Sequence, residues 1–405
     1  MGQTKRLKRL EDWAVVKRFL PTGWQEAARS EGALRRARGV GDAEALLRTL
    51  LVHLADGCSL RETALRAGQA GWCKLSTVAL FKRLQASEHW LRWLAESLWR
   101  QRARAVAWGG YRVRAIDATA VKEAGRTGSL WRVHYALGLR DLQCDFFELT
   151  DVRGGETFRR IPVRRGDLVL GDRAYSTPPG VAHVVGAGGA VLVRANLQSL
   201  PLFTERGQRI AVMRRLRALR SGQIGEWGAY VHAPDGQRIA GRLIAIKRSR
   251  HATRAIRKRL RRKASKQQHA VSQTALDQAQ YFFAWTSVPV EELTAAQILE
   301  LYRLRWQIEL AFKRLKSIMG LGQLPKRADA SARAWLHGKL FVALLVERLL
   351  ETATAFSPWG YTLEEAAQSL ARVSLHVPRA HHCRFTSARS GCNVGAVARD
   401  LPRVG

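Results

Sequence analysis

The chain has 405 residues, which is enough for two or three domains with a large core. Lys and Arg number 68 against 33 Asp and Glu, and so large an excess (+35) indicates a polyanionic partner. The longest apolar run, residues 340–346, is too short to span a bilayer, and no apolar stretch follows the basic N-terminus as it would in a secretion signal. Five scattered cysteines favour a reduced compartment. We therefore expect a cytoplasmic protein that binds nucleic acid and no membrane.

Residues 1–105 have helical patterns. Amphipathic helices are predicted at 42–55, 59–68 and 76–84, followed by a core-facing helix at 89–95. Ser59 and Glu62 have the spacing of a capping box. A helix, a Gly-containing turn and a basic helix give residues 59–84 the outline of a helix-turn-helix, whose second helix can enter a DNA major groove. Plain helical bundles share this outline, so both interpretations stay open.

Residues 106–330 show the patterns of strands and short helices. Strands are predicted at 111–119, 131–137, 145–150, 167–175, 190–195 and 281–286, and short helices at 155–162 and 181–190. Three strands followed by helix, strand, helix and strand indicate an α/β layer arrangement. Open α/β sheets usually place their sites at strand ends, and Asp117 and Asp172 each close an apolar strand.

The remaining segments are assigned from composition. Short strands broken by turns predict a β-rich insertion at 200–250. Residues 247–266 are the densest basic stretch, which would be unstable as an isolated helix, and we expect a basic arm there. Such a stretch is often only solvated, but the charge of the whole chain favours contact with the DNA backbone. Residues 331–375 are predicted to be helical and 376–405 to form a loosely ordered tail.

One helix is predicted to carry the chemistry. Over residues 302–316, Tyr302, Arg305, Glu309 and Lys316 fall within an arc of about 60° on a single helix. A neighbouring apolar arc faces a core, and it comprises Leu301, Leu304, Ile308, Phe312 and Leu315. A carboxylate therefore stands among a phenol, a guanidinium and an ammonium. Most charged stripes of this kind are solvated surface, and that interpretation stays open for the helix taken alone.

Asp117, Asp172 and Glu309 could converge at one edge of the sheet. Three carboxylates repel one another unless a divalent metal neutralises them, and Mg²⁺ prefers such oxygen ligands together with substrate phosphates. Two ions about 4 Å apart can activate a nucleophile and stabilise the leaving oxygen of a phosphoryl transfer. For each Asp alone, an ordinary turn or cap explains the residue equally well.

The motifs together resemble a known family. Tyr302, Arg305, Glu309 and Lys316 match the Tyr-x2-Arg-x3-Glu-x6-Lys signature of insertion-sequence-four-type transposases. Residues 116–119, around Asp117, and 171–175, around Asp172, are similar to the first and second acidic motifs of that family. The resemblance covers residues 45–350. It implies a ribonuclease-H-like catalytic core with a β-rich insertion, an N-terminal helical domain (1–105) that binds DNA ends, and a C-terminal helical segment (331–375) for dimerisation.

The resemblance also implies roles for residues. Asp117, Asp172 and Glu309 would hold Mg²⁺, with Mn²⁺ as a substitute, and Tyr302, Arg305 and Lys316 would contact the element end. Further contacts to DNA or phosphate are expected from residues close to the motifs and in the basic arm: Lys313, Arg173, Tyr175, Phe282, Trp285, Arg257, Lys258 and Arg261. Some relatives carry a Trp that stacks on a flipped base. Phe282 is nearest that position, with Trp285 close by.

We therefore predict a bacterial, nucleoid-associated transposase that acts as a homodimer on double-stranded DNA. It would cleave the ends of its mobile element by metal-dependent hydrolysis and join the 3′ hydroxyls to target DNA. Two alternatives remain at this stage. One is a stand-alone nuclease of the same fold, which cleaves without joining strands. The other is a catalytically silent relative that only occupies DNA ends.

Overall fold

The computed structural model describes residues 13–37, 39–100, 110–123, 129–325 and 328–355. The predictions for 356–375 and for the tail at 376–405 lie outside these residues. Within them, no helix is both long and apolar enough to cross a membrane.

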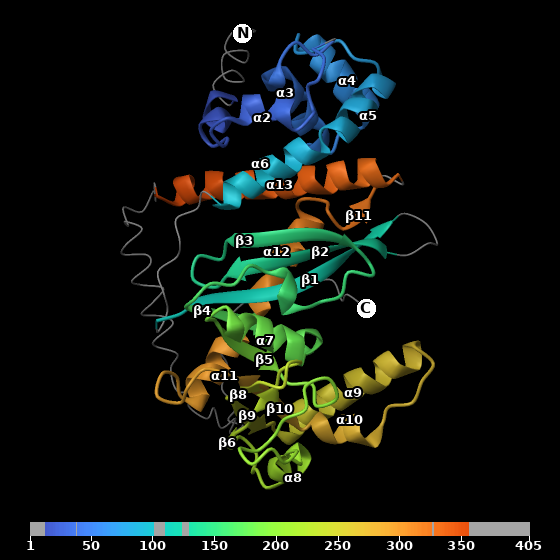
Figure 1. Cartoon of the computed structure of the whole chain (residues 1–405). Helices are drawn as coiled ribbons and strands as arrows, with labels where there is room; N and C mark the ends of the chain where they lie inside the picture. Colours follow the sequence, from blue (N-terminus) through green and yellow to red (C-terminus); the bar gives the residue numbers. More distant parts are fainter. Residues whose placement is uncertain (1–12, 38, 101–109, 124–128, 326–327, 356–405) are drawn as a thin grey trace, which may run out of the picture. The chain divides into compact units, whose positions relative to one another are not determined.

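The N-terminal part of the described chain is helical, as predicted (Figure 1). Its elements are α2 (Trp24–Ser30), α3 (Ala43–Leu54), α4 (Leu60–Gln69), α5 (Thr77–Ala86) and α6 (Glu88–Arg100). Ser59 and Ser76 cap α4 and α5, because each hydroxyl accepts a backbone N–H of the first turn. Glu62 pairs with Arg66 at 2.6 Å. Helices α4 and α5, with the turn between them, thus have the predicted helix-turn-helix outline.

The α/β part contains one nine-stranded sheet. Its strands are β1 (Arg112–Glu123), β2 (Ser129–Gly138), β3 (Cys144–Asp151), β4 (Asp167–Gly171), β5 (Ala190–Arg194), β6 (Ile224–Gly228), β9 (Arg242–Lys247), β10 (Tyr281–Thr286) and β11 (Gln323–Leu324). The order is β3-β2-β1-β4-β5-β10-β9-β6, with β11 beside β1. β1, β4 and β5 run parallel, while β2 and β3 at one side and β10, β9 and β6 at the other pair antiparallel. The predicted strands are present, except that the strand predicted at 167–175 ends at Gly171 and residues 173–175 form a short helix.

Four short helices accompany these strands. They are η1 (Phe158–Arg160), η2 (Arg173–Tyr175), α7 (Pro178–Gly186) and α8 (Val212–Arg217). A separate hairpin is formed by β7 (Val231–His232) and β8 (Arg238–Ile239). Residues 200–250, predicted to form a β-rich insertion, contain β6 to β9. β6 and β9 continue the central sheet through β10, a pairing between distant segments that a local pattern does not reveal.

The basic stretch is folded, contrary to the expectation of an unstable arm. It forms helix α9 (Arg250–Lys266), which Ser249 caps by accepting the N–H of Ala252. Arg257 donates from Nε to the carbonyl of Leu276 at 3.1 Å, which ties α9 to α10 (Gln273–Gln278). Tertiary contacts of this kind stabilise a helix whose own like charges oppose it.

The predicted single helix around Arg305 is two helices. These are α11 (Ala295–Arg303) and α12 (Trp306–Ser317). Between them the N–H groups of Leu304 and Arg305 bond three residues back, to Leu301 and Tyr302, instead of four. Tighter turns rotate the following residues relative to a continuous α-helix. Tyr302 is therefore buried, with 9% exposure, while the side chain of Glu309 is 59% exposed.

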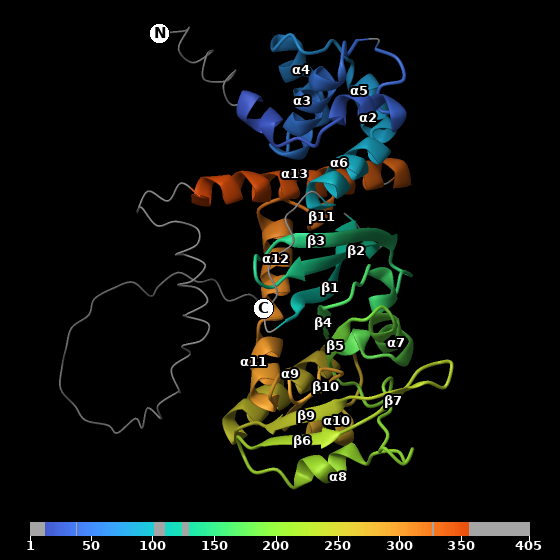
Figure 2. The same ribbon diagram turned by 60° about the vertical axis from the view of Figure 1, so that its left-hand side comes forward.

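Helix α13 (Asp329–Ala355) is apolar on most sides over residues 334–345, which are buried. Figures 1 and 2 show α13 between α6 and the sheet. Arg333 pairs with Glu88 of α6 at 3.0 Å, and Gly338 lies against Leu54 of α3. Residues 334–345 thus pack inside their own chain, and the role of 331–375 in pairing subunits stays a prediction.

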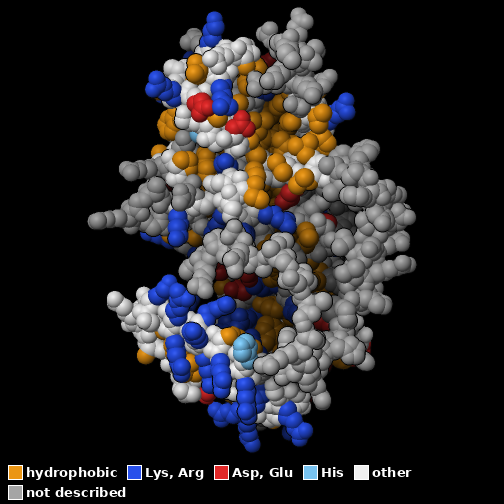
Figure 3. Space-filling view, turned by 180° about the vertical axis from the view of Figure 1, so that it is seen from behind, with side chains coloured by type: hydrophobic (Ala, Val, Ile, Leu, Met, Phe, Trp, Pro, Cys, Tyr) orange, Lys and Arg blue, Asp and Glu red, His pale blue; other side chains and the backbone are white. Residues whose placement is uncertain are grey.

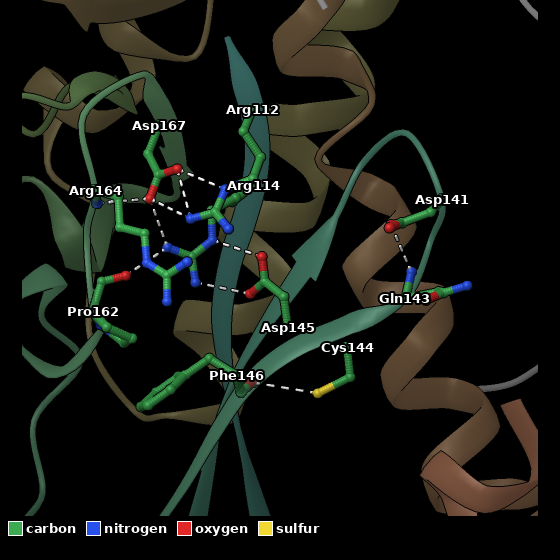
Figure 4. Close-up of polar contacts among 10 residues, drawn as sticks. All are labelled: Arg112, Arg114, Asp141, Gln143, Cys144, Asp145, Phe146, Pro162, Arg164 and Asp167. Atoms are coloured by element: carbon green, nitrogen blue, oxygen red, sulfur yellow. Dashed lines mark hydrogen bonds and ion pairs between the residues drawn. The ribbon is translucent and has the colours of Figure 1, made fainter. Parts of the chain in front are cut away.

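A buried ion network ties three strands together (Figure 4). Arg114 of β1 is 1% exposed and donates to both carboxylate oxygens of Asp145, at 2.7 and 2.8 Å. Its third nitrogen reaches the carbonyl of Pro162 and, at 3.1 Å, Asp167 of β4. Asp167 also accepts two bonds from Arg112. The network fixes β1 and β4 side by side three to five residues before Asp117 and Asp172.

Candidate active site

Asp117 and Asp172 lie on neighbouring parallel strands, but only Asp172 follows the end of its strand. β1 continues to Glu123, so the prediction that Asp117 closes its strand is wrong. β1 and β4 are parallel, and Ala115 pairs with Leu170 in their register. Asp117 and Asp172 each follow this pair by two residues. Because side chains alternate along a strand, both continue the face of Ala115 and Leu170. The structure thus brings these two predicted acids together.

Each of these carboxylates is anchored by a backbone N–H. Oδ1 of Asp117 accepts from Ala118 at 2.8 Å, and Oδ1 of Asp172 accepts from Ala174 at 2.8 Å and caps η2. Burial raises the pKa of Asp117 to about 7, against the bond from Ala118, and the negative charge of Asp172 raises it further. The environment of Asp117 therefore favours a nearby positive charge.

Arg305 supplies that charge and separates Asp117 from the third predicted acid. Its Nη1 lies 3.5 Å from Oδ2 of Asp117, and its Nη2 lies 2.5 Å from Oε1 of Glu309. The guanidinium thus bridges β1 and α12. The prediction that Glu309 meets the two Asp residues directly is not what the structure shows, since the break before α12 places Arg305 between them.

A divalent metal nevertheless fits the donors of this site. All three side chains offer carboxylate oxygens, the ligands that Mg²⁺ prefers. The Oδ2 of Asp117 meets only the long contact from Arg305 among the described residues. Within the described ranges no three His, Cys, Asp or Glu side chains are grouped closely enough to hold a metal as they stand. Binding through Glu309 would require Arg305 to release it.

The sequence interpretation missed a fourth carboxylate near the two Asp residues. Glu156 precedes η1, and burial and the charge of Asp172 raise its pKa while Arg132 opposes the shift. The charge of Glu156 in turn raises the pKa of Asp117. A lone Glu in a loop between two strands carries no local signal of this proximity.

Two aromatic residues predicted to contact DNA are buried. Trp285 is 0% exposed and donates to the carbonyl of Ala229, and Tyr175 is 1% exposed. Neither lies on the surface, as contact with DNA would require, because both fill the core on one face of the sheet. Phe282 is half-buried and packs on Tyr302 with ring centroids 4.9 Å apart.

The rings of Phe282 and Tyr302 line a cavity of about 290 Å³. Burial raises the pKa of Tyr302 to about 12, so its hydroxyl is a neutral donor near pH 7. Through Tyr302, which lies near Arg305 and Asp172, this pair of rings borders the site.

Three arginines gather beside Asp172, and the sequence interpretation named only one of them. Arg173, Arg194 and Arg248 follow or end β4, β5 and β9. Burial, followed by the charges of Arg194 and Arg173, lowers the pKa of Arg248 to about 10. Among the described residues none of the three has a carboxylate within 4.0 Å, and Nε of Arg173 is buried without a partner. Arg248 donates from Nη1 to the carbonyls of Ala279 and Tyr281. Guanidiniums without a carboxylate partner can hold a phosphate.

The remaining basic residues are spread over a larger surface. Nine of the 17 residues of α9 are Lys or Arg, and Lys258 and Arg261 point to solvent, while Arg257 bonds to the backbone. In Figure 3, Lys and Arg side chains gather over the lower part of the molecule, which holds α9 and α10 in Figure 1. Lys313 and Lys316 are exposed on α12, and Lys316 lies near Lys122 rather than near the acids.

Comparison with known proteins adds to this geometry. A family model described as "Transposase DDE domain" matches residues 148–345. The putative transposase InsL of insertion sequence IS186A from Escherichia coli is 32% identical over 357 residues, which span 86% of this chain and 96% of that protein. The transposase of insertion sequence IS421 from Escherichia coli is also 32% identical, with the same coverage.

Among solved structures, a piggyBac transposase synaptic complex with hairpin DNA aligns with a TM-score of 0.46 and 9% identity. The alignment covers 88% of this chain and 79% of that one.

Proposed function

The chain belongs to the insertion-sequence transposases with a DDE domain and is a DNA transposase, and on this basis we propose that Asp117, Asp172 and Glu309 are its DDE acids. The observation that supports the assignment is the register of β1 and β4, in which Asp117 within β1 and Asp172 after β4 both follow the pair Ala115 and Leu170 by two residues. Glu309 is linked to Asp117 through Arg305.

The proposed core is ribonuclease-H-like. The antiparallel strands β1 to β3 followed by the parallel strands β4 and β5 support this assignment, although the sheet continues into β10, β9 and β6. We assign residues 106–330 to the catalytic core and the helices before it to binding of the element ends. The exposed face of α5, with Lys82, is available for that contact.

In the proposed mechanism a divalent cation, Mg²⁺ or Mn²⁺, is held by the carboxylates of Asp117, Asp172 and Glu309. Bound there together with DNA, the cation would promote hydrolysis of the phosphodiester and stabilise the leaving oxygen. With a second cation present, one ion would activate the attacking oxygen while the other stabilises the leaving oxygen. Asp117 must be ionised to act as a ligand, and the nearby guanidinium of Arg305 favours this form. The cation also allows the carboxylates to lie close together.

The protein's own cations position the substrate in this proposal. Arg173, Arg194 and Arg248 would hold phosphates of the strand being cut, because none of them pairs with a carboxylate among the described residues and their charges lie close to one another. Tyr302 would donate a hydrogen bond, and Phe282 is the ring available to a base. When a phosphate engages Arg305, this residue can release Glu309 to the cation.

The wider basic surface would bind DNA without regard to sequence. The cations of α9 have no carboxylate within 4.0 Å among the described residues, so they are available to backbone phosphates. Cutting both ends of an element in a coordinated way requires two active sites, and we propose a homodimer on two ends, acting in the bacterial cytoplasm on nucleoid DNA.

The test is incubation of the purified protein with DNA carrying its own element ends and Mg²⁺. We expect cleavage at the ends and joined products. Cleavage without joining would favour a stand-alone nuclease, and end binding with neither reaction would favour a catalytically silent relative. Asp172→Asn serves as the matched control, because it keeps the size of the side chain and removes its charge.

A further inference from the structure

Arg242, the first residue of β9, is buried and binds the loop that precedes α11. The residue is 6% exposed. Its Nε donates to the carbonyl of Val288 at 2.8 Å, and its Nη2 donates to the carbonyls of Pro289, at 3.1 Å, and Leu293. Its Nη1 pairs with Glu226 of β6 at 2.5 Å. One guanidinium thus satisfies three carbonyls of a single loop, which a planar fork of donors can do and a single ammonium cannot.

The beginning of the same loop is tied to β5. The N–H of Ser287 donates to the carbonyl of Val191 at 3.0 Å, and the hydroxyl of Ser287 accepts the N–H of Val191 at 2.9 Å. The hydroxyl of Thr286, the last residue of β10, also donates to that carbonyl, at 2.7 Å. Residues 286–293 are therefore held against the sheet at both ends, by β5 where the loop starts and by β9 where it meets α11.

Helix α11 begins directly after this loop. Thr294 caps the helix in a capping box with Gln297, and it follows Leu293, whose carbonyl Arg242 binds. A short α-helix behaves as a stiff rod, because every turn is closed by backbone hydrogen bonds. A displacement of the first turn of α11 is therefore transmitted to its last turn.

The last turn of α11 leads into the candidate active site. Tyr302 packs there on Phe282 with ring centroids 4.9 Å apart. Arg305 follows α11 by two residues and lies 3.5 Å from Asp117 and 2.5 Å from Glu309. The longer contact is at the limit of a hydrogen bond, so a small outward shift of α11 breaks it. Misplacing reacting groups by about 1 Å costs about 10²-fold in rate.

We propose that Arg242 is a positioning residue for the cleavage reaction. By binding three loop carbonyls it sets where α11 starts, and thereby where Arg305 and Glu309 stand relative to Asp117. The inference rests on the proposed function and deepens it. Arg242 acts through the loop and the helix, since its guanidinium is taken up by the loop carbonyls and Glu226.

The experiment compares Arg242→Lys with the wild type, both full-length, on DNA carrying the element's own ends. Single-turnover cleavage of the bound end should slow by about tenfold or more, while the Kd for the end changes little. A loss of folded protein alone would lower the amplitude of the reaction and leave the rate of the bound complex unchanged. Arg242→Gln, which removes both the charge and the fork, should slow cleavage likewise, and thermal melts establish which variants are folded.

The matched control is Glu226→Gln. It removes the charge that pairs with Arg242 and keeps the bonds from Arg242 to the loop. Its rate of single-turnover cleavage should equal that of the wild type. A rate in Glu226→Gln as low as in Arg242→Lys would mean that the ion pair, rather than the grip on the loop, is what matters, and would overturn the inference.

A second measurement does not depend on cleavage. Hydrogen–deuterium exchange in the DNA-free protein should be faster over residues 295–317 in Arg242→Lys than in the wild type, and unchanged in α2 to α6. Wild-type cleavage, or wild-type exchange over 295–317, in Arg242→Lys would overturn the inference. Faster exchange in this variant of a protein that neither cuts nor joins its ends would reject the proposed function and support the placement of α11 by Arg242.

Discussion

The guanidinium of Arg305 lies 2.5 Å from the carboxylate of Glu309. The same group reaches Asp117 at 3.5 Å. Arg305 therefore neutralises an acid on the sheet and an acid on α12 at once. A DNA phosphate near the site would compete with both carboxylates for this cation.

We predict that Arg305→Ala lowers the rate of end cleavage by about 10² or more, the usual effect of removing a donor aimed at developing charge. Arg314→Ala is the matched control, because Arg314 is an exposed arginine of the neighbouring helix α12. Single-turnover cleavage measures both. Equal rates for Arg305→Ala and wild type would contradict the role of Arg305.

The raised pKa of Asp117 predicts a dependence of stability on pH. The folded state holds this proton up to about pH 7, whereas an ordinary Asp releases it near pH 4. The unfolded state therefore binds fewer protons between these values, and the contribution of Asp117 to stability is lost as pH rises through about 7. In a chelating buffer the Tm of the wild type should fall more between pH 5 and 8 than that of Asp117→Asn. Parallel curves would show that Asp117 has an ordinary pKa.

The network around Arg114 predicts a large loss of stability. Arg114→Ala leaves Asp145 without its partner in a buried setting, and breaking such pairs costs about 3–5 kcal/mol. Arg66→Ala removes an exposed pair with Glu62 and should cost less than about 1 kcal/mol. Urea denaturation measures the free energy of unfolding of each. A change below about 1 kcal/mol for Arg114→Ala would mean that the network does not hold the strands.

The two basic areas should differ in what they recognise. Arg194→Ala should weaken binding to element ends more than to unrelated DNA, since Arg194 lies beside Asp172 in the site. The double change Lys258→Ser with Arg261→Ser on α9 should weaken both alike and reduce the salt slope of binding, by about one unit per lost phosphate contact. Fluorescence anisotropy at several salt concentrations tests this. Equal losses on both DNAs for Arg194→Ala would place it outside the site.

Local patterns were sufficient for much of this fold. Alternation located β1 to β3, apolar runs located β4, β5 and β10, and Ser59 marked the start of α4, because these signals depend on neighbouring residues alone. That Asp172 follows an apolar strand was also visible, whereas Asp117 lies within β1 because this strand continues to Glu123. The two acids became neighbours once β1 and β4 proved parallel.

Features that depend on distant segments could not be predicted. The pairing of β9 with β10 joins residues that α9 and α10 separate, and the helix break at Arg305 results from three-residue hydrogen bonds that periodicity does not reveal. The packing of η1 brings Glu156 towards the site, and the end of β9 brings Arg248 there. Trp285 was predicted to contact DNA from its position in the sequence, but its side chain is buried in the core.

The most direct test of the account is strand transfer from a pre-cleaved element end that bears a free 3′ hydroxyl. Wild-type protein with Mg²⁺ should join this end to a target plasmid, while Asp117→Asn and Asp172→Asn should bind the same end and give no joined product. Joining by either variant at the wild-type rate would contradict the assignment of these two residues, on which the rest of the proposed site depends.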